Sequence, residues 1–121
     1  MKTKKALTLM ATAVLLAGGL LSSPAAAGTG DDCPSGAACL YDYYNFDGLL
    51  GWRNPGMPRT AISSANNDKM ASWINKMSTN GAWYKDVSGG PCFTMGANTV
   101  NSALSIFDRD TASSWKTTGG C

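Results

Sequence analysis

Beyond its first 27 residues, the chain has apolar residues only in short runs, and residues that form turns separate each run from the next. Runs of four to six residues with partial alternation are typical of strands, since a helix needs a longer apolar period. The intervals are rich in Gly, Asn, Pro and Ser, which adopt the backbone angles of turns. The predicted strands span residues 39–44, 49–53, 72–77, 82–87, 91–95 and 114–118. This spacing, with 14 glycines, favours a small all-β sandwich.

Two segments carry more specific expectations. In residues 71–77 the alternation places Trp73 opposite Ser72 and Ile74, which predicts a strand with one face against a core. Residues 98–107 have a short helical turn as their alternative, because Val100, Leu104 and Phe107 follow one another at spacings of four and three. The isolated large residues are expected in the core, namely Met70, Trp73, Met77, Trp83, Met95 and Trp115.

The chain also contains an internal repeat. The stretch Asp68-Lys-Met-Ala-Ser-Trp73 returns 42 residues later as Asp110-Thr-Ala-Ser-Ser-Trp115, and Leu40-Tyr41-Asp42 has a looser echo in residues 83–86. Two copies are too few for a solenoid, which needs at least about three stacked units. The repeat therefore predicts two similar units packed face to face in one domain.

The first 27 residues are predicted to be a signal peptide. Three lysines precede an apolar run from Ala6 to Leu21, and Ala25-Ala26-Ala27 supplies the small residues of a cleavage site. A membrane helix needs about 20 apolar residues, so an uncleaved anchor is the weaker alternative. We expect a secreted, extracellular protein whose single domain spans residues 28–121.

Removal of the leader reverses the sign of the net charge. Lys and Arg fall from 10 to 7 while all 8 Asp remain, so the mature charge is 7 minus 8, or −1. A basic surface for nucleic acid or anionic lipid is therefore absent from the expected mature protein. We expect a monomer that binds neither nucleic acid nor membrane.

All four cysteines, Cys33, Cys39, Cys92 and Cys121, lie in the predicted exported part, where an even count indicates two disulfides. Four cysteines allow three pairings, and the sequence alone does not decide among them. We favour Cys33 with Cys39, which bracket a turn-rich Pro-Ser-Gly loop, and hence Cys92 with Cys121. A thiolate metal site is the rival interpretation, but the chain has no C-x-x-C pair and no His to complete one.

Missing residue types argue against an enzyme. Without His, and without Glu after the leader, the chain lacks the groups for Ser-His-Asp or Cys-His catalysis, for His-bound zinc and for glutamate acid catalysis. Hydrolysis would need a pair of Asp such as Asp31 with Asp32 or Asp108 with Asp110. Both pairs are better explained as solvated loop carboxylates.

One motif resembles a known fold family. In Tyr41-Asp-Tyr-Tyr-Asn-Phe46-Asp-Gly48, two aromatics are followed by a glycine, as in the folded hairpin of a βγ-crystallin Greek key. Gly48 can take a positive φ where the hairpin folds over, and Tyr41 and Phe46 can cover the bend. The Asp-x-x-Ala/Ser-Ser-Trp repeats look like the turn that closes each such motif. The resemblance implies a two-motif Greek-key sandwich in one small disulfide-bonded domain.

The block Cys33-Pro-Ser-Gly-Ala-Ala-Cys39 runs directly into this hairpin. The combination resembles a family of secreted bacterial peptidase inhibitors typified by the Streptomyces metalloproteinase inhibitor. It implies inhibition of an extracellular protease, a metalloprotease in the founding case, by tight binding without catalysis. The second hairpin departs from the pattern: counted from Trp83, its second aromatic position is Ser88, so Phe93 or the Cys92 disulfide would have to hold the bend. Cys92 also has no close cysteine partner, so the family's short reactive disulfide loop is not carried over.

Two surfaces are candidates for contact with a protease. One is the disulfide loop with Pro34, Ser35 and Gly36, and its alternative role is to staple the amino terminus. The other is the segment 49–59 with Leu50, Trp52 and Met57, of which Leu50 and Trp52 have the core as their alternative. Presentation of an ordered loop lowers the entropy lost on docking.

Calcium binding is the competing function. Apart from a possible calcium ion, no cofactor is expected. The crystallin-type pattern of two Asn or Asp, two variable residues, Ser or Thr, and Ser supplies oxygen ligands. Each copy here misses one position, Ala71 in the first and Arg109 in the second. The alternative is that Asp68 and Asp110 only bond backbone amides in their own turns. The possible ligands are Asn67, Asp68, Ser72, Asp110, Ser113 and Ser114. A toxin on the same fold is a remote third class, since no basic amphipathic helix is visible.

Overall fold

The computed structural model describes residues 28–121, so the predicted leader and its cleavage site lie outside the described part of the chain. Its elements, in chain order, are β1 (Ala38–Tyr43), the 3₁₀ turn η3 (Tyr44–Phe46), β2 (Asp47–Arg53), β3 (Thr60–Ala61), β4 (Ser72–Asn75), β5 (Gly81–Asp86), β6 (Gly89–Met95), β7 (Thr99–Asn101) and β8 (Ser114–Lys116). Among these residues no helix is long and apolar enough to cross a membrane.

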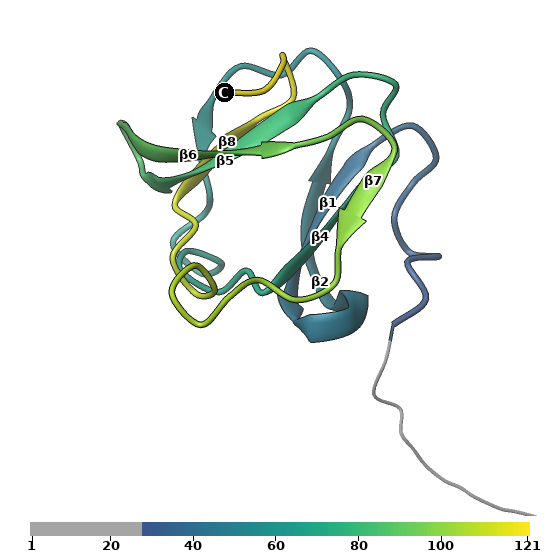
Figure 1. Cartoon of the computed structure of the whole chain (residues 1–121), viewed down its shortest axis with the longest axis horizontal. Coiled ribbons are helices and arrows are strands. Elements are labelled where there is room, and N and C mark those ends of the chain that lie inside the picture. The colour runs from purple at the N-terminus through teal and green to yellow at the C-terminus, as the bar shows by residue number, and fades with distance from the viewer. Residues whose placement is uncertain (1–27) are drawn as a thin grey trace, which may run out of the picture.

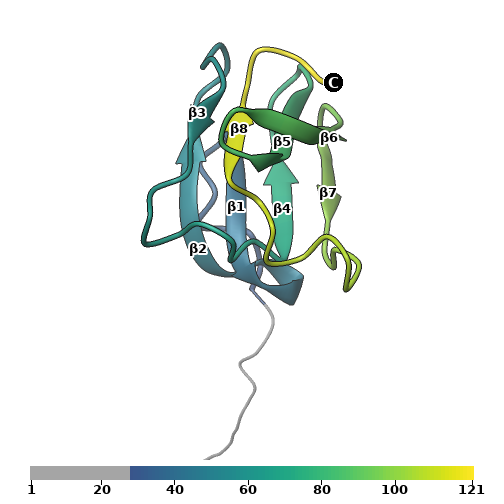
Figure 2. The same cartoon turned by 90° about the vertical axis from the view of Figure 1, so that its left-hand side faces the viewer.

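The strands form two four-stranded antiparallel sheets, in the orders β2-β1-β4-β7 and β3-β8-β5-β6. Figures 1 and 2 show the two sheets packed as layers of a sandwich. Each half of the chain gives its third strand to the other half's sheet, because β3 pairs with β8 and β7 pairs with β4. The predicted two-motif, all-β Greek-key sandwich is confirmed.

The two halves use the same backbone bonds at equivalent positions. The amide of Ala71 donates to Tyr41 O at 2.8 Å, and the amide of Ser113 donates to Tyr84 O at 2.9 Å. Ala71 and Ser113 are 42 residues apart, so the sequence repeat is a structural repeat. The structure places Tyr84, not Trp83, at the position of Tyr41, which corrects the count made from Trp83.

The core between the sheets is built from sulfur-containing and aromatic side chains. All six isolated residues predicted there are buried: Met70, Trp73, Met77, Trp83, Met95 and Trp115. Leu40 pairs with Trp73 across the first sheet, and Trp83 pairs with Trp115 across the second. Methionine fills the gaps that the tryptophan rings leave, because its side chain is unbranched and flexible.

The helical turn expected as an alternative for residues 98–107 is wrong. Residues 98–107 do not form a helical turn, since β7 is an edge strand in which Val100 pairs with Ile74. Val100 and Phe107 are exposed, and only Leu104 of the predicted apolar face is buried. The short strands β3 and β7 are absent from the sequence prediction, because two or three residues carry too little alternation to be recognised.

The strand β4 is buried on both faces, whereas one buried face was predicted. On the outer face Ile74 joins Tyr41 and the Cys33–Cys39 pair in a second apolar cluster. This cluster is closed by residues 28–37, here called the N-terminal strap, which lies on the outer side of the sheet in Figure 1. The strap therefore buries a face that the strand alternation alone would leave to solvent.

Two buried serines, here called the corner serines, hold the hairpins down. The hydroxyl of Ser72 donates to Tyr43 O at 2.6 Å and accepts the amide of Phe46 at 3.1 Å. The hydroxyl of Ser114 donates to Asp86 O at 2.7 Å. Each bond ties the fold-over of one hairpin to a neighbouring strand, so Ser72 and Ser114 lie at tight corners as predicted from the repeat.

We predict that Ser72→Ala destabilises the protein by about 1–3 kcal/mol, because it leaves the partly buried amide of Phe46 and the carbonyl of Tyr43 without their partner. Urea unfolding followed by tryptophan fluorescence measures this change. The matched control is Ser64→Ala in an exposed turn, which should change stability by less than about 0.5 kcal/mol. Equal effects of the two substitutions would show that the corner bond is not a stabilising element.

Candidate functional site

The first hairpin has the geometry that its motif predicts. Tyr41 and Phe46 meet edge to face with ring centres 5.9 Å apart. Gly48 has a φ of 73°, and a Cβ atom there would lie 3.0 Å from Tyr43 Cδ2. Only glycine fits this bend without strain or displacement of the tyrosine.

The second hairpin is shorter than the first. Tyr43 pairs with Asp47 across three intervening residues, whereas Asp86 pairs with Gly89 across only Val87 and Ser88. The position of the second aromatic is therefore deleted, not substituted by Ser88. Phe93 of β6 stacks on Trp83 with ring centres 4.2 Å apart, but this pair belongs to the core between the sheets and does not cover the bend as Phe46 does. Cys92, which precedes Phe93, forms a disulfide with Cys121 at the carboxyl terminus.

Both disulfides have the favoured pairing. Cys33 bonds Cys39, with Cα atoms 5.8 Å apart, and Cys92 bonds Cys121, with Cα atoms 5.9 Å apart. The first joins the N-terminal strap to β1, and the second joins β6 to the last residue of the chain. Both ends of the domain are therefore fixed covalently to the sandwich.

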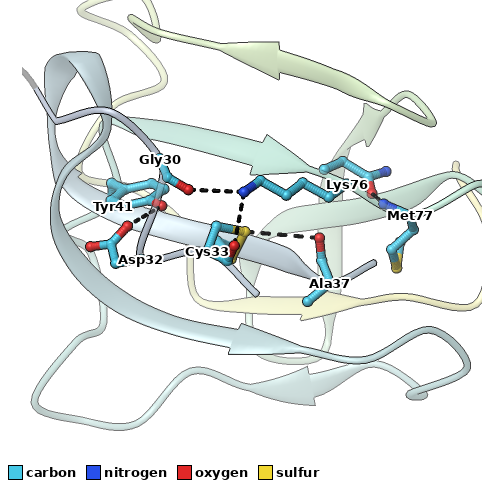
Figure 3. The surroundings of a disulfide bond; sticks show 9 residues. Gly30, Asp32, Cys33, Ala37, Tyr41, Lys76 and Met77 are labelled. Atoms are coloured by element: carbon cyan, nitrogen blue, oxygen red, sulfur yellow. Dashed lines mark hydrogen bonds between the residues drawn. A yellow bond between two sulfur atoms is a disulfide. The ribbon is translucent and has the colours of Figure 1, made fainter. Parts of the chain in front are cut away.

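Around the first disulfide, the strap is also held by polar bonds (Figure 3). The ammonium group of Lys76 donates to Gly30 O at 3.0 Å and to Cys33 O at 2.8 Å. The Tyr41 hydroxyl donates to Asp32 at 2.7 Å. Burial raises the pKa of Tyr41 well above its ordinary range, and the bond to Asp32 raises it further.

These bonds give the Cys33–Cys39 loop a clear structural role. Pro34 O accepts the amide of Ala37, and only the small residues Ser35 and Gly36 stand exposed at the turn. Of the residues expected on this candidate surface, the structure brings Pro34, Ser35 and Gly36 together at one tip. That tip offers no large side chain to a partner.

The second candidate surface is divided. Leu50 is partly buried against the core, whereas Trp52 and Met57 are 48% and 45% exposed. The loop between β2 and β3 is held by buried Thr117, whose hydroxyl donates to Asn54 O at 2.6 Å and accepts the Met57 amide at 2.8 Å.

At the base of this loop Arg53 donates to Trp115 O at 2.6 Å and lies 4.6 Å from the centre of the Trp115 ring. Burial lowers the pKa of Arg53. The Thr117 amide also donates to Met57 O at 2.9 Å, so both backbone groups of Met57 are already bonded within the protein. A partner can therefore reach Met57 through its side chain and not by strand pairing at that residue.

The possible calcium ligands lie in two places related by the repeat. Asp68 and Asp110 both have left-handed backbone angles, with φ of 60° and 61°. The Asp68 amide donates to Ala112 O at 3.0 Å, and the Asp110 amide donates to Met70 O at 2.9 Å. Each turn is therefore completed by the other half of the chain. The hydroxyls of Ser72 and Ser114 are occupied by the corner bonds.

Each turn is completed by the other half of the chain. The two positions that depart from the calcium pattern, one from each copy, therefore lie beside each other. Ala71 and Arg109 line the same cavity of about 330 Å³ as Asp110, together with Asp42, Tyr43 and Tyr44. The other place keeps its oxygen groups, with the Ser113 hydroxyl donating to Asp68 at 3.2 Å. Within residues 28–121, no group of three or more His, Cys, Asp or Glu side chains is placed to hold a metal ion.

In each Asp pair considered for hydrolysis, one carboxylate is engaged in a structural bond. Asp32 accepts the Tyr41 hydroxyl, and Asp108 forms an ion pair with Lys85 at 3.1 Å.

Sequence reasoning missed one exposed apolar feature. Ile106 and Phe107 are 71% and 78% exposed at the tip of the turn that follows Leu104. The spacing of Phe107 from Leu104 and Val100 indicated only an alternative helical turn. The signal that could have identified it is the repeat itself, since the equivalent positions in the first copy are Ser64 and Ala65.

The fold defines the protein as a βγ-crystallin-type domain. A βγ-crystallin domain from a study of the evolution of the eye-lens fold is 20% identical, with a TM-score of 0.58 over 74% of this chain and 91% of its own. A domain from Clostridium beijerinckii is 22% identical, with a TM-score of 0.54 over 66% of this chain and 94% of its own. One from Flavobacterium johnsoniae is 20% identical, with a TM-score of 0.52 over 68% of this chain and 92% of its own.

The family follows from a separate match. Residues 26–94, or 69 of the chain's 121, match the model of peptidase inhibitor family I36. The chain belongs to this family, which confirms the resemblance drawn from the cysteine block and the first hairpin. Membership in a family of inhibitors also agrees with the prediction of a non-catalytic protein. A search of curated proteins finds no match.

Proposed function

We propose that the protein is exported and inhibits an extracellular metallopeptidase by tight, non-catalytic binding. The observation that carries this proposal is membership in peptidase inhibitor family I36. The predicted leader and the two disulfides fit a protein that works in an oxidising compartment. The metallopeptidase target comes from the resemblance to the Streptomyces inhibitor.

The build of the domain supports such a role physically. Cross-links at both ends and the corner serines leave the free protein close to one conformation, so little entropy is lost when it docks. A cross-linked chain is also a poor peptidase substrate, because cleavage requires local unfolding.

The proposal predicts that the mature protein, residues 28–121, abolishes the activity of a thermolysin-type peptidase at micromolar excess. Residual activity against a chromogenic substrate measures this, with a subtilisin-type enzyme in parallel to test the choice of class. The Clostridium beijerinckii domain serves as a control of the same fold. Full activity of both enzymes in the presence of the protein would count against inhibition altogether, and loss of only the subtilisin-type activity would reject the metallopeptidase.

A second candidate function, calcium binding, is favoured by one observation. Since Ala71 and Arg109 share one cavity, the place formed by Asn67, Asp68 and Ser113 has lost none of its oxygen groups. With one carboxylate at its centre, this place would have the weak affinity of extracellular calcium modules, with a Kd on the order of 10⁻⁴–10⁻³ M. The place beside Arg109 does not fit a cation.

For this candidate, 10 mM calcium should stabilise the folded protein by roughly 1.5–3 kcal/mol, because the ion binds the native state only. The melting temperature in calcium against EDTA reports the effect. Asp68→Asn should reduce it, because the ligand keeps an oxygen but loses its charge, and the matched variant Asp110→Asn should leave it unchanged. An unchanged melting temperature for the unsubstituted protein would reject calcium binding.

A further inference from the structure

The two most exposed large apolar side chains of the described residues are neighbours in sequence. Ile106 and Phe107, here called the apolar tip, stand at the end of the turn between β7 and β8. Water contact over two such side chains is unfavourable by about 25 cal/mol for each Å² of apolar surface. Exposed apolar surface of this kind on an ordered turn marks a contact site.

The fold does not require apolar residues at this tip, because the chain builds the same turn twice. In the first copy the amide of Asn66 donates to Ser63 O at 2.9 Å, and in the second the amide of Asp108 donates to Ser105 O at 3.0 Å. The two residues between these partners are Ser64 and Ala65 in the first copy and Ile106 and Phe107 in the second. The turn also forms with the small residues Ser64 and Ala65, so the apolar pair serves something other than folding.

The tip is also held more firmly than the first copy's turn. Ser105 O accepts a second amide, that of Arg109, at 2.9 Å. The ammonium group of Lys85 donates to Phe107 O at 3.1 Å and pairs with Asp108 at 3.1 Å. Thr111 donates its hydroxyl to Asp108 O. The side chains are therefore presented on a backbone that is already closed, which is the condition for tight docking.

The surroundings have the composition of a binding site. Tyr43, 61% exposed, and Tyr44 come from the first hairpin and line the cavity of about 330 Å³ with Arg109. The Arg109 guanidinium lies 5.8 Å from the centre of the Tyr44 ring. Tyrosine and arginine are enriched among residues that dominate binding energy at interfaces.

We propose that the apolar tip is the part of this inhibitor that enters the peptidase, with Ile106 and Phe107 in apolar pockets of its substrate cleft and Tyr43 and Arg109 at the rim. This rests on the proposed inhibition and names its contact surface. Because Ser105 O accepts two amides of the turn and Phe107 O accepts the ammonium group of Lys85, the tip is not an extended strand, and it blocks the cleft through side chains without being cleaved.

This position separates the tip from the surfaces expected from sequence. In Figures 1 and 2 the chain between β7 and β8 lies at the bottom with η3, whereas the loop between β2 and β3 lies at the top with the carboxyl terminus. A peptidase seated on the apolar tip would therefore leave Trp52 and Met57 uncovered.

The test exchanges the tip for the residues that the chain itself uses in the same turn, as the double variant Ile106→Ser/Phe107→Ala. Its inhibition constant for the peptidase that the unsubstituted protein inhibits should rise at least about 100-fold, the loss expected when two anchors of an interface are truncated. Its melting temperature should stay within a few degrees. The control Val100→Thr, which removes another exposed apolar side chain, should inhibit as the unsubstituted protein does.

The outcomes are distinguishable. If the unsubstituted protein inhibits and the double variant inhibits equally well, the tip assignment is overturned while the inhibitory function stands. If inhibition is lost instead in the double variant Trp52→Ser/Met57→Ser, the peptidase contact lies at the opposite end of the sandwich, on the loop between β2 and β3. If the unsubstituted protein inhibits no peptidase, both proposals fail. A dimer in light scattering that the double variant converts to a monomer would show that a second copy covers the tip, and this also overturns the assignment.

Discussion

The bond from the Ser72 hydroxyl to Tyr43 O, with its counterpart from Ser114 to Asp86 O, is the interaction on which the rest of this small domain depends. A hairpin of two strands is marginal by itself in water, and it persists only when its bend is fastened to a further strand. Ser72 also accepts the amide of Phe46, so one hydroxyl fixes both sides of η3. The exposed Tyr43 residue takes its position from the Ser72 corner, and the turn that carries Ile106 is fixed beside the same strand by the bonds from the Leu104 amide to Ala71 O and from the Asp110 amide to Met70 O.

The N-terminal strap and the disulfides add further fixed contacts. They cover a sheet face that a sandwich normally leaves in water. Strand β4 can carry Ile74 on its outer face because the strap and the Cys33–Cys39 pair cover it. Lys76, bonded to two carbonyls of the strap, replaces part of the hydration that those carbonyls lose. For a domain of this size, with a core built mainly of Met and Trp, these additions compensate for limited burial.

Much of the fold could be predicted from the sequence because its signals are local. The turn residues delimited six of the eight strands within a few positions, the Tyr41 to Gly48 spacing predicted the hairpin, and the Asp-to-Trp repeat predicted the corner serines. The pairing of the cysteines was also as expected. The exchange of strands between the two halves was not predictable, because β3 and β7 are strands only where they pair with the other half of the chain. The burial of Ile74 on the outer face was not predictable either, because it depends on the strap.

In the candidate site, too, the local patterns were predictable and the long-range contacts were not. The calcium pattern was visible in sequence, but only the fold shows that its two departures, Ala71 and Arg109, lie at the same place. Phe107 was named only as one position of an alternative helical turn and Ile106 was not singled out, because periodicity does not distinguish an apolar residue that faces a core from one that faces a partner. Comparison of the two copies, Ser64 and Ala65 against Ile106 and Phe107, separates the demands of the turn from those of function.

We propose that the corners hold one end of the sandwich ready for a peptidase. Amide hydrogen exchange of the protein, free and in complex with an inhibited peptidase, tests this most directly. The account predicts added protection in residues 105–110 and 43–46, with no change in residues 54–59. Protection centred on residues 54–59 or 34–36 would contradict it.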